Sequence, residues 1–287
     1  MATFETTIDV MNPIWNRDAW ARLQGNLDSS KTKFIASKGT VMGVEDGKAV
    51  YPMCGFEATL ATRLEPQEDG TIRRINRETI IYTDARTGEI INEWTDPETK
   101  EVVPVVHVYN DPFNYSISEW LIIMPEDFGG DKPVAPIKVP LIFPWRDLGN
   151  GMMELSTDMH LYYPNQLQPA QWPRESSGPM VQVSEMMRYQ FKKADIENPE
   201  LTGVDYTGSW SRVTPWLPWM LRGTKPGHVL YMGSNVCSDN TDIFSANIRA
   251  HLEANAPEFL TAPDSDYGPS LSSLEHYAKE QTPAPVK

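Results

Sequence analysis

Turn-forming segments divide the first third of the chain into short strand-like runs, and their spacing constrains the fold more than any other feature. The segments "EDGK" (45–48), "EDGT" (68–71), "DARTGE" (84–89) and "TDPETKE" (95–101) each separate runs rich in β-branched and aromatic residues. Such clusters are typical of connections between antiparallel strands. The pattern therefore predicts an antiparallel meander.

Later segments extend this pattern, with further strands predicted over 139–143, 152–163, 181–193, 204–213 and 229–232. About ten strands do not remain comfortably in one open flat sheet. We therefore expect a mainly β fold, either an antiparallel β-barrel or a strongly curled sheet of the lipocalin kind. Helices are expected near the two ends, over 18–27 and from Asn240 or Thr241 to the residue before Pro257. The prediction is one domain over 1–260, followed by a tail over 261–287 with a short helix in "SLSSLEHYAKE".

Charge and cysteine content narrow the partners and the location. A formal net charge of −14 argues against binding to nucleic acid or to an anionic membrane, because both require clustered Lys and Arg. The two cysteines, Cys54 and Cys237, have no zinc-ligand spacing. The start of the chain lacks the pattern of a secretory signal, and no apolar run is long enough to span a bilayer. We expect a cytoplasmic protein, and a homo-oligomer is compatible with this composition.

The stretch "VVPVVHVYNDPFN" (102–114) places several groups capable of proton transfer at the end of an apolar strand. Strand alternation puts His107 and Tyr109 on the same face, where they could share an apolar cavity as proton acceptor and donor. Asn110 and Asn114 would then contact a ligand. The alternative is that His107 and Tyr109 are core residues that satisfy each other or the backbone, and that "NDP" is simply a turn.

A second strand, "MMELSTDMHLYYPN" (152–165), repeats this chemistry. Asp158, His160 and Tyr162 alternate on one face, where the carboxylate could orient the histidine and the tyrosine could donate to an oxyanion. The alternative is that this polar face is simply solvated. Tyr163 in "HLYYPN" is a further candidate for ligand binding.

The segment "SWSRVTPWLPWM" (209–220) could form an aromatic wall from Trp210, Trp216 and Trp219. Arg212 shares a strand face with Trp210 and could stabilise negative charge on a ligand. The alternative is that these tryptophans and prolines only close one end of the fold. No nucleotide-binding, zinc-protease or nucleophile-elbow motif is present, so we expect no cofactor and no metal.

A family resemblance rests on "GFEATLATRLEPQEDGTIRRINRETIIYTDARTGEIINEWTDPETKEVVPVVHVYNDPFN", together with "HLYYPN" and "WSRVTPWLPWM". Over most of 55–232, this sequence resembles a bacterial and fungal family catalogued as domain of unknown function 1838. The family name implies no reaction. Bacteria that degrade lignin dimers use cofactor-independent lyases, and this association makes a lignin-derived or other phenylpropanoid-type compound one expected ligand.

These observations favour a cofactor-independent enzyme, specifically a lyase, that acts on a hydrophobic aromatic small molecule by acid–base chemistry. His107 or His160 would take the proton, Tyr109 or Tyr162 would donate one, and Arg212 would stabilise charge. Isomerisation and hydrolysis remain open. The alternatives are a non-catalytic, lipocalin-like carrier and a metal-dependent hydrolase that uses His107, His160 and neighbouring acids.

Overall fold

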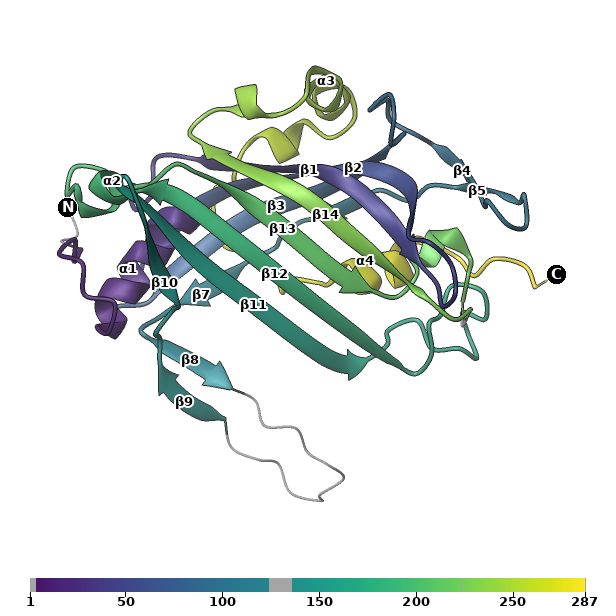
Figure 1. Cartoon of the computed structure of the whole chain (residues 1–287), viewed down its shortest axis with the longest axis horizontal. Coiled ribbons are helices and arrows are strands. Elements are labelled where there is room, and N and C mark those ends of the chain that lie inside the picture. Colours follow the sequence, from purple (N-terminus) through teal and green to yellow (C-terminus); the bar gives the residue numbers. More distant parts are fainter. Residues whose placement is uncertain (1–3, 124–135, 224, 287) are drawn as a thin grey trace.

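The computed structural model describes residues 4–123, 136–223 and 225–286, and a ten-stranded antiparallel sheet dominates it (Figure 1). The strand order is β10-β11-β12-β13-β14-β1-β2-β3-β6, and β7 also pairs with β3. The sheet strands are β1 (Lys33–Val44), β2 (Tyr51–Pro66), β3 (Ile72–Thr83), β6 (Val108–Asn110), β7 (Tyr115–Ile117), β10 (Trp145–Gly149), β11 (Met152–Pro164), β12 (Met180–Lys192), β13 (Tyr206–Thr214) and β14 (His228–Ser238).

Two small hairpins and a few short helices complete the fold. The hairpins are β4 (Glu93–Thr95) with β5 (Val102–Pro104), and β8 (Trp120–Ile123) with β9 (Ile137–Pro140). The helices are α1 (Pro13–Gln24), α2 (Lys193–Glu197), α3 (Ala246–Asn255) and α4 (Ser273–Glu280), with 3₁₀ turns η1 (Pro218–Met220), η2 (Thr241–Ile243) and η3 (Pro257–Leu260). None of the described helices is long and apolar enough to cross a membrane.

The predicted meander is present over β1–β3, whereas the "TDPETKE" turn joins β4 and β5 in a separate two-stranded sheet. Strands β1, β2 and β3 follow one another through the "EDGK" and "EDGT" turns, where Gly47 and Gly70 adopt φ angles of 72° and 84°. Glycine adopts this left-handed conformation without a steric penalty. Strand β14 then pairs with β1 over eleven residue pairs, from Phe34↔Ser238 to Val44↔His228, so the two halves of the chain form one sheet.

The expected closure of the sheet is wrong: the sheet is neither a barrel nor strongly curled. Among the described residues, β10 at one edge pairs only with β11, and β6 and β7 at the other edge pair only with β3. The edge strands contain five, three and three residues, whereas the strands between them contain nine to sixteen. Short edge strands offer few backbone groups for pairing, and helices cover the apolar faces instead.

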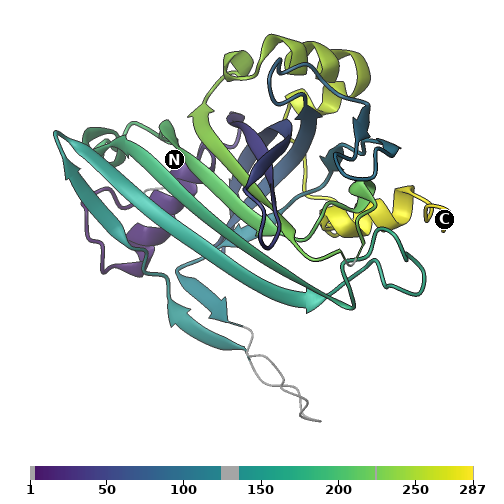
Figure 2. The same ribbon diagram turned by 45° about the vertical axis from the view of Figure 1, so that its right-hand side comes forward.

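The two faces of the sheet differ in what covers them (Figure 2). We call one the cavity face. At one end of it, Trp15, Ala19 and Leu23 of α1 pack in a cluster with residues of β1 and β11–β14. At its other end, Tyr277 of α4 packs against a cluster that contains Trp216 and Trp219. On the opposite, outer face, α3, η2 and η3 cover β1–β3 through two further apolar clusters. The outer face of β11–β14 carries exposed side chains.

Candidate functional site

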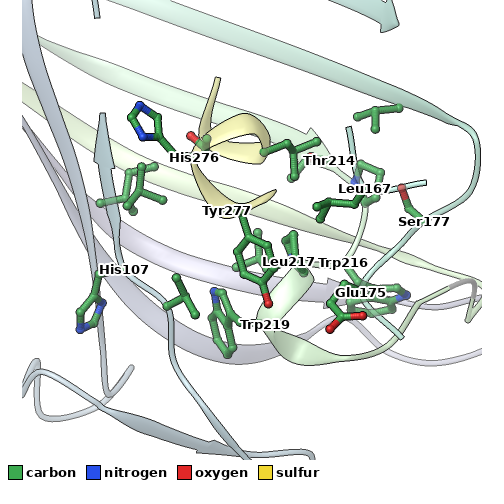
Figure 3. A pocket seen from close by; sticks show the side chains of 18 of the residues that line it. His107, Leu167, Glu175, Ser177, Thr214, Trp216, Leu217, Trp219, His276 and Tyr277 are labelled. Carbon is green, nitrogen blue, oxygen red and sulfur yellow. The ribbon is translucent and has the colours of Figure 1, made fainter. Parts of the chain in front are cut away.

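A cavity of about 90 Å³ lies on the cavity face between β3 and β6 on one side and β11–β14 on the other (Figure 3). The segment 214–219 and helix α4 complete its walls. Seven tyrosine and tryptophan side chains line it: Tyr82, Tyr109, Tyr163, Trp216, Trp219, Tyr231 and Tyr277. Cavities that bind small molecules are commonly apolar and aromatic, with a few polar groups that orient the ligand.

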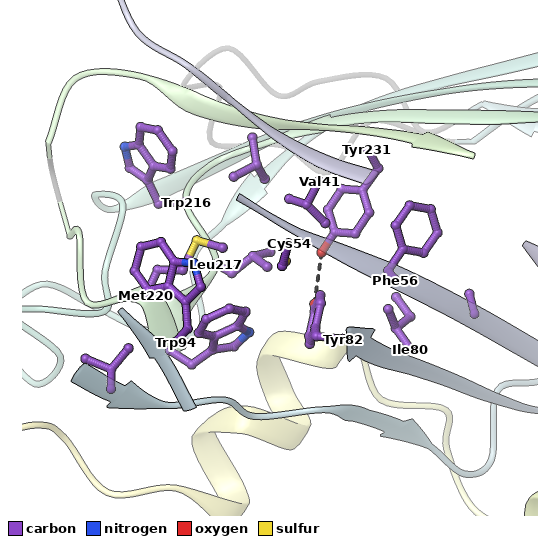
Figure 4. Packing of buried hydrophobic residues seen from close by; sticks show 14 residues of the cluster. Val41, Cys54, Phe56, Ile80, Tyr82, Trp94, Trp216, Leu217, Met220 and Tyr231 are labelled. Carbon is purple, nitrogen blue, oxygen red and sulfur yellow. Dashed lines mark hydrogen bonds between the residues drawn. The ribbon is translucent and has the colours of Figure 1, made fainter. Parts of the chain in front are cut away.

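The tryptophan wall is held by an anchored turn. Trp219 is buried against Tyr82 and Trp94, with ring centroids 5.1 and 5.9 Å apart. The guanidinium of Arg222 lies 4.5 Å from the ring centroid of Trp216, and its Nε donates to Asp96 at 2.9 Å. This buried ion pair and the cation–π contact fix the turn that carries both tryptophans. Figure 4 shows the cluster of buried apolar residues to which Trp94 and Trp216 belong.

Helix α4 forms the roof of the cavity. Ser272 and Glu275 make a capping box at its start, which satisfies backbone N–H groups of the first turn. Ser273, His276 and Tyr277 line the cavity, and the Tyr277 ring lies 5.7 Å from that of Trp172. None of the helix residues is fully buried. The roof is therefore attached by capping, hydrogen bonds and ring contacts rather than by a deep apolar core.

Arg212 is the only Lys or Arg among the described residues that line the cavity. Its Nη1 lies 3.3 Å from the Glu185 carboxylate, which also accepts a hydrogen bond from Trp210 Nε1 at 3.0 Å. Although burial opposes the charge, the carboxylate of Glu185 raises the pKa of Arg212, so the guanidinium is charged. Its Nε is buried and has no hydrogen-bond partner among the described residues.

Asn110 lines the opposite wall and is 1% exposed. Its Nδ2 donates to Glu78 Oε2 at 2.7 Å and to Ser273 Oγ of α4 at 3.1 Å. Burial raises the pKa of Glu78. Both hydrogens of the amide are thus engaged, and its Oδ1 is buried without a partner within the described parts of the chain.

His107 and Tyr109 border the cavity, where His107 Nδ1 and the Tyr109 hydroxyl have partners and His107 Nε2 is buried without one among the described residues. His107 Nδ1 accepts a hydrogen bond from the Tyr82 backbone N–H at 3.1 Å, and the Tyr109 hydroxyl lies 2.9 Å from His251 Nε2. Burial, with a smaller contribution from His251, lowers the pKa of His107 to about 4. The Tyr109 hydroxyl is therefore directed at α3, whereas His107 lies between Tyr82 and His251 of α3, with ring centroids 6.1 and 6.0 Å away.

The second predicted cluster lies on the outer face. His160 bridges Asp158 and Ser184, with distances of 3.2 Å from Nε2 to Asp158 Oδ2 and 3.0 Å from Nδ1 to Ser184 Oγ. The side chains of Asp158 and His160 are 60% and 62% exposed. Tyr162 is also exposed, and strand alternation turns the neighbouring Tyr163 into the cavity instead. Solvent competes for the polar atoms of such an exposed contact and weakens it.

Two further predicted residues lie near the cavity without lining it. Asn114 accepts from the Asn76 backbone N–H at 2.8 Å and donates to Asp266, so it braces the segment before α4. Trp210 packs behind the wall, between Phe56 and Tyr231, with ring centroids 5.5 and 5.3 Å away. Of the residues predicted to form the site, the structure thus brings together His107, Tyr109, Asn110, Tyr163, Arg212, Trp216 and Trp219.

The sequence matches one protein-family model, described as protein of unknown function (DUF1838), over residues 30–281. The chain belongs to the DUF1838 family. The resemblance predicted from the sequence is confirmed. No curated protein matches the chain. The DUF1838 match includes every described residue that lines the cavity, those of α4 among them, and it begins after α1.

Sequence patterns did not identify His276 of the cavity lining, or two glutamates that pair with lining residues of this DUF1838 chain. Glu185 and Glu78 lie on predicted strands, but their partners Arg212 and Asn110 become evident only from the strand register. His276 lines the cavity from α4, with Nε2 buried and unpartnered among the described residues and Nδ1 3.4 Å from Glu280 Oε1. The Glu275 capping signal identifies the helix but not the surface on which it docks. No group of three or more potential metal ligands occurs within the described ranges.

Proposed function

We propose that the cavity binds a hydrophobic, aromatic small molecule and that the protein acts on it by acid–base chemistry as a lyase. The observation that carries the proposal is the coincidence of an aromatic lining with unpartnered polar atoms. Asn110, Arg212 and His276 all line the cavity, and each has a buried polar atom without a partner among the described residues. A buried polar atom without a hydrogen bond costs about 1–3 kcal/mol, and a bound ligand could remove that cost.

The cavity lining also supplies groups suited to proton transfer. If His276 Nδ1–H donates to Glu280, its Nε2 is the basic atom and can accept a proton in the cavity. Burial raises the pKa of Tyr163, so its hydroxyl stays protonated and can donate. Arg212 is charged and would stabilise negative charge that develops on a ligand oxygen. His276 thus takes the role that the sequence assigned to His107 or His160.

The simplest reaction for this set is elimination from a β-hydroxy ketone. His276 would remove the proton from the carbon next to the carbonyl, and Arg212 would stabilise the enolate oxygen. The carbon–oxygen bond to the hydroxyl group would then break, with a proton from Tyr163, to release water and an α,β-unsaturated ketone. Each role requires only residues that line the cavity.

A direct test uses 3-hydroxy-1-phenylpropan-1-one as the probe and follows formation of phenyl vinyl ketone by chromatography. The wild-type protein should accelerate its formation, and His276→Gln should reduce the rate by about 10²- to 10⁴-fold, the usual contribution of a general base. His160→Gln, which changes an exposed histidine of the outer face, is the matched control and should leave the rate unchanged. Equal rates with and without the wild-type protein would contradict the proposed reaction.

A non-catalytic carrier is the second candidate, because α4 covers the cavity and would retain a bound molecule. Saturation-transfer NMR with acetophenone separates the two. Binding of acetophenone without turnover of any aromatic β-hydroxy ketone would favour the carrier. The cytoplasmic location also stays a proposal, supported by the two cysteines, which are free and buried.

A further inference from the structure

The charges around the cavity restrict what kind of aromatic molecule it can hold. Arg212 is already paired with Glu185, and the Glu78 carboxyl lies close enough to interact electrostatically with both. Two more carboxyl groups, of Glu175 and Glu280, belong to the lining. Arg212 therefore provides a hydrogen-bond donor without providing an excess of positive charge. A carboxylate ligand would enter a site that has no surplus cation to balance it.

The unpartnered atoms define the hydrogen bonds that a ligand must complete. Arg212 Nε can only donate, so it requires an acceptor such as a carbonyl oxygen. Asn110 Oδ1 can only accept, so it requires a hydroxyl or N–H group. The orientation of this amide is determined by its neighbours, because Glu78 and Ser273 each accept one of its two N–H bonds.

We infer that the ligand is a neutral aromatic molecule that carries both a carbonyl oxygen, bound by Arg212, and a hydroxyl group, bound by Asn110. This inference rests on the proposed function and specifies its substrate class. Asn110 contacts the ligand, whereas Glu78 and Ser273 are positioning residues that hold its amide. Glu185 sets the charge preference, because it neutralises the only Lys or Arg of the described lining.

Three matched probes test the two halves of the inference. 4-Hydroxyacetophenone has both groups, acetophenone lacks the hydroxyl, and 4-hydroxybenzoate replaces the methyl ketone by a carboxylate of similar shape. Dissociation constants are measured by ligand-observed NMR, at a pH where the phenol is un-ionised. For the wild-type protein, we expect 4-hydroxyacetophenone to bind at least about threefold more tightly than acetophenone, as one added hydrogen bond provides. It should also bind at least about tenfold more tightly than 4-hydroxybenzoate, because one charge is left unbalanced.

Two variants assign these preferences to residues. Asn110→Leu should abolish the advantage of the hydroxyl group and leave acetophenone binding within about twofold, since acetophenone has no hydroxyl group to donate to Asn110. Glu185→Gln should remove the disadvantage of 4-hydroxybenzoate, because it frees the charge of Arg212. Glu154→Gln is the control, as it changes a carboxylate on the outer face of the neighbouring strand β11.

The outcomes separate this inference from the proposed function. If the probes bind but the wild-type protein prefers 4-hydroxybenzoate, or does not distinguish the two ketones, the inference is wrong while the cavity remains an aromatic binding site. If Asn110→Leu does not fold, the wild-type affinities and the Glu185→Gln variant still decide the matter. If none of the three probes binds at millimolar concentration, both the inference and the proposed aromatic site are wrong.

Discussion

The hydroxyl groups of Tyr82 and Tyr231 lie 2.9 Å apart, although β1 and β2 separate their strands in the sheet (Figure 4). Both side chains are 2% exposed, and burial raises the pKa of Tyr82 to about 12 and that of Tyr231 well above its usual value. The pair thus remains un-ionised at neutral pH. It is a hydrogen bond in the cavity wall, between residues that are distant in the sheet.

Replacing either tyrosine of this pair should lower the free energy of unfolding by more than half of the loss caused by replacing both. Tyr82→Phe or Tyr231→Phe leaves the other hydroxyl buried without its partner, and each should lower the free energy of unfolding by about 1–3 kcal/mol. In the double variant no unpaired hydroxyl remains, so its loss should be less than the sum. Urea denaturation of all four proteins gives the coupling energy. Strict additivity would mean that the two hydroxyl groups do not stabilise each other.

The stability of the protein should fall as the pH is lowered from about 6.5 to about 4, in part because of His107. The folded state resists protonation of this imidazole, since burial disfavours its charged form and His251 adds a smaller contribution. The unfolded chain, with an ordinary pKa near 6.5, binds the proton first in this range. This group therefore stabilises the fold fully above pH 6.5 and loses roughly 1–3 kcal/mol as the pH approaches 4.

His107→Gln should flatten that part of the pH profile, because it removes the titrating group. The measurement is the free energy of unfolding in urea at several pH values for the wild type and the variant. His160→Gln is the control, because His160 is exposed on the outer face. A profile for His107→Gln that parallels the wild type would show that other groups dominate the acid sensitivity.

Binding of acetophenone should quench tryptophan fluorescence through the wall formed by Trp216 and Trp219. Both indoles line the cavity, and a ketone stacked on them would quench their emission. Trp219→Phe should reduce the amplitude of quenching, while Trp120→Phe, on the exposed hairpin strand β8, should not. Titrations of the three proteins at equal concentration provide the comparison. An unchanged amplitude in Trp219→Phe would place the ligand elsewhere.

Opening the roof should change ligand kinetics more than stability. Tyr277→Ala removes a ring that packs against Trp172 but belongs to a helix without fully buried residues, so we expect a loss of only about 1 kcal/mol. Acetophenone should associate and dissociate faster, as seen by stopped-flow fluorescence. Tyr162→Ala removes an exposed ring from the outer face and should leave both rates unchanged. Equal rates in all three proteins would mean that α4 does not limit access.

The parts of the fold that depend on local sequence could be predicted, and those that depend on pairing could not. The "EDGK" and "EDGT" turns and the alternation along β11 identified strands and placed Tyr162 and Tyr163 on opposite faces. Strand number, however, does not decide closure, because closure requires long edge strands that match each other. No residue pattern in the sequence indicates how short β6, β7 and β10 are.

The same distinction holds for the site. Arg212 and the tryptophans were recognisable from unusual residue types within one segment. The contact of Glu185 with Arg212 depends on the register of β12 against β13, and that of Ser273 with Asn110 joins segments far apart in the chain. From its sequence, a polar amphipathic helix such as α4 is expected to belong to a solvated tail. Its docking cannot be predicted locally, because it depends on a surface formed by other strands.

Strands β11 and β12 pair without irregularity along their whole length, from Met152↔Lys192 to Pro164↔Met180. The parity of a residue number along β11 therefore decides whether its side chain lies on the cavity face or on the outer face. If one residue were inserted near the start of β11 and the later residues kept their pairing with β12, each later side chain would stay on its present face. Slipping the pairing by one residue would instead turn Asp158, His160 and Tyr162 to the cavity face and Tyr163 to the outer face. The chemistry available to the cavity is in this sense a property of strand register as much as of residue identity.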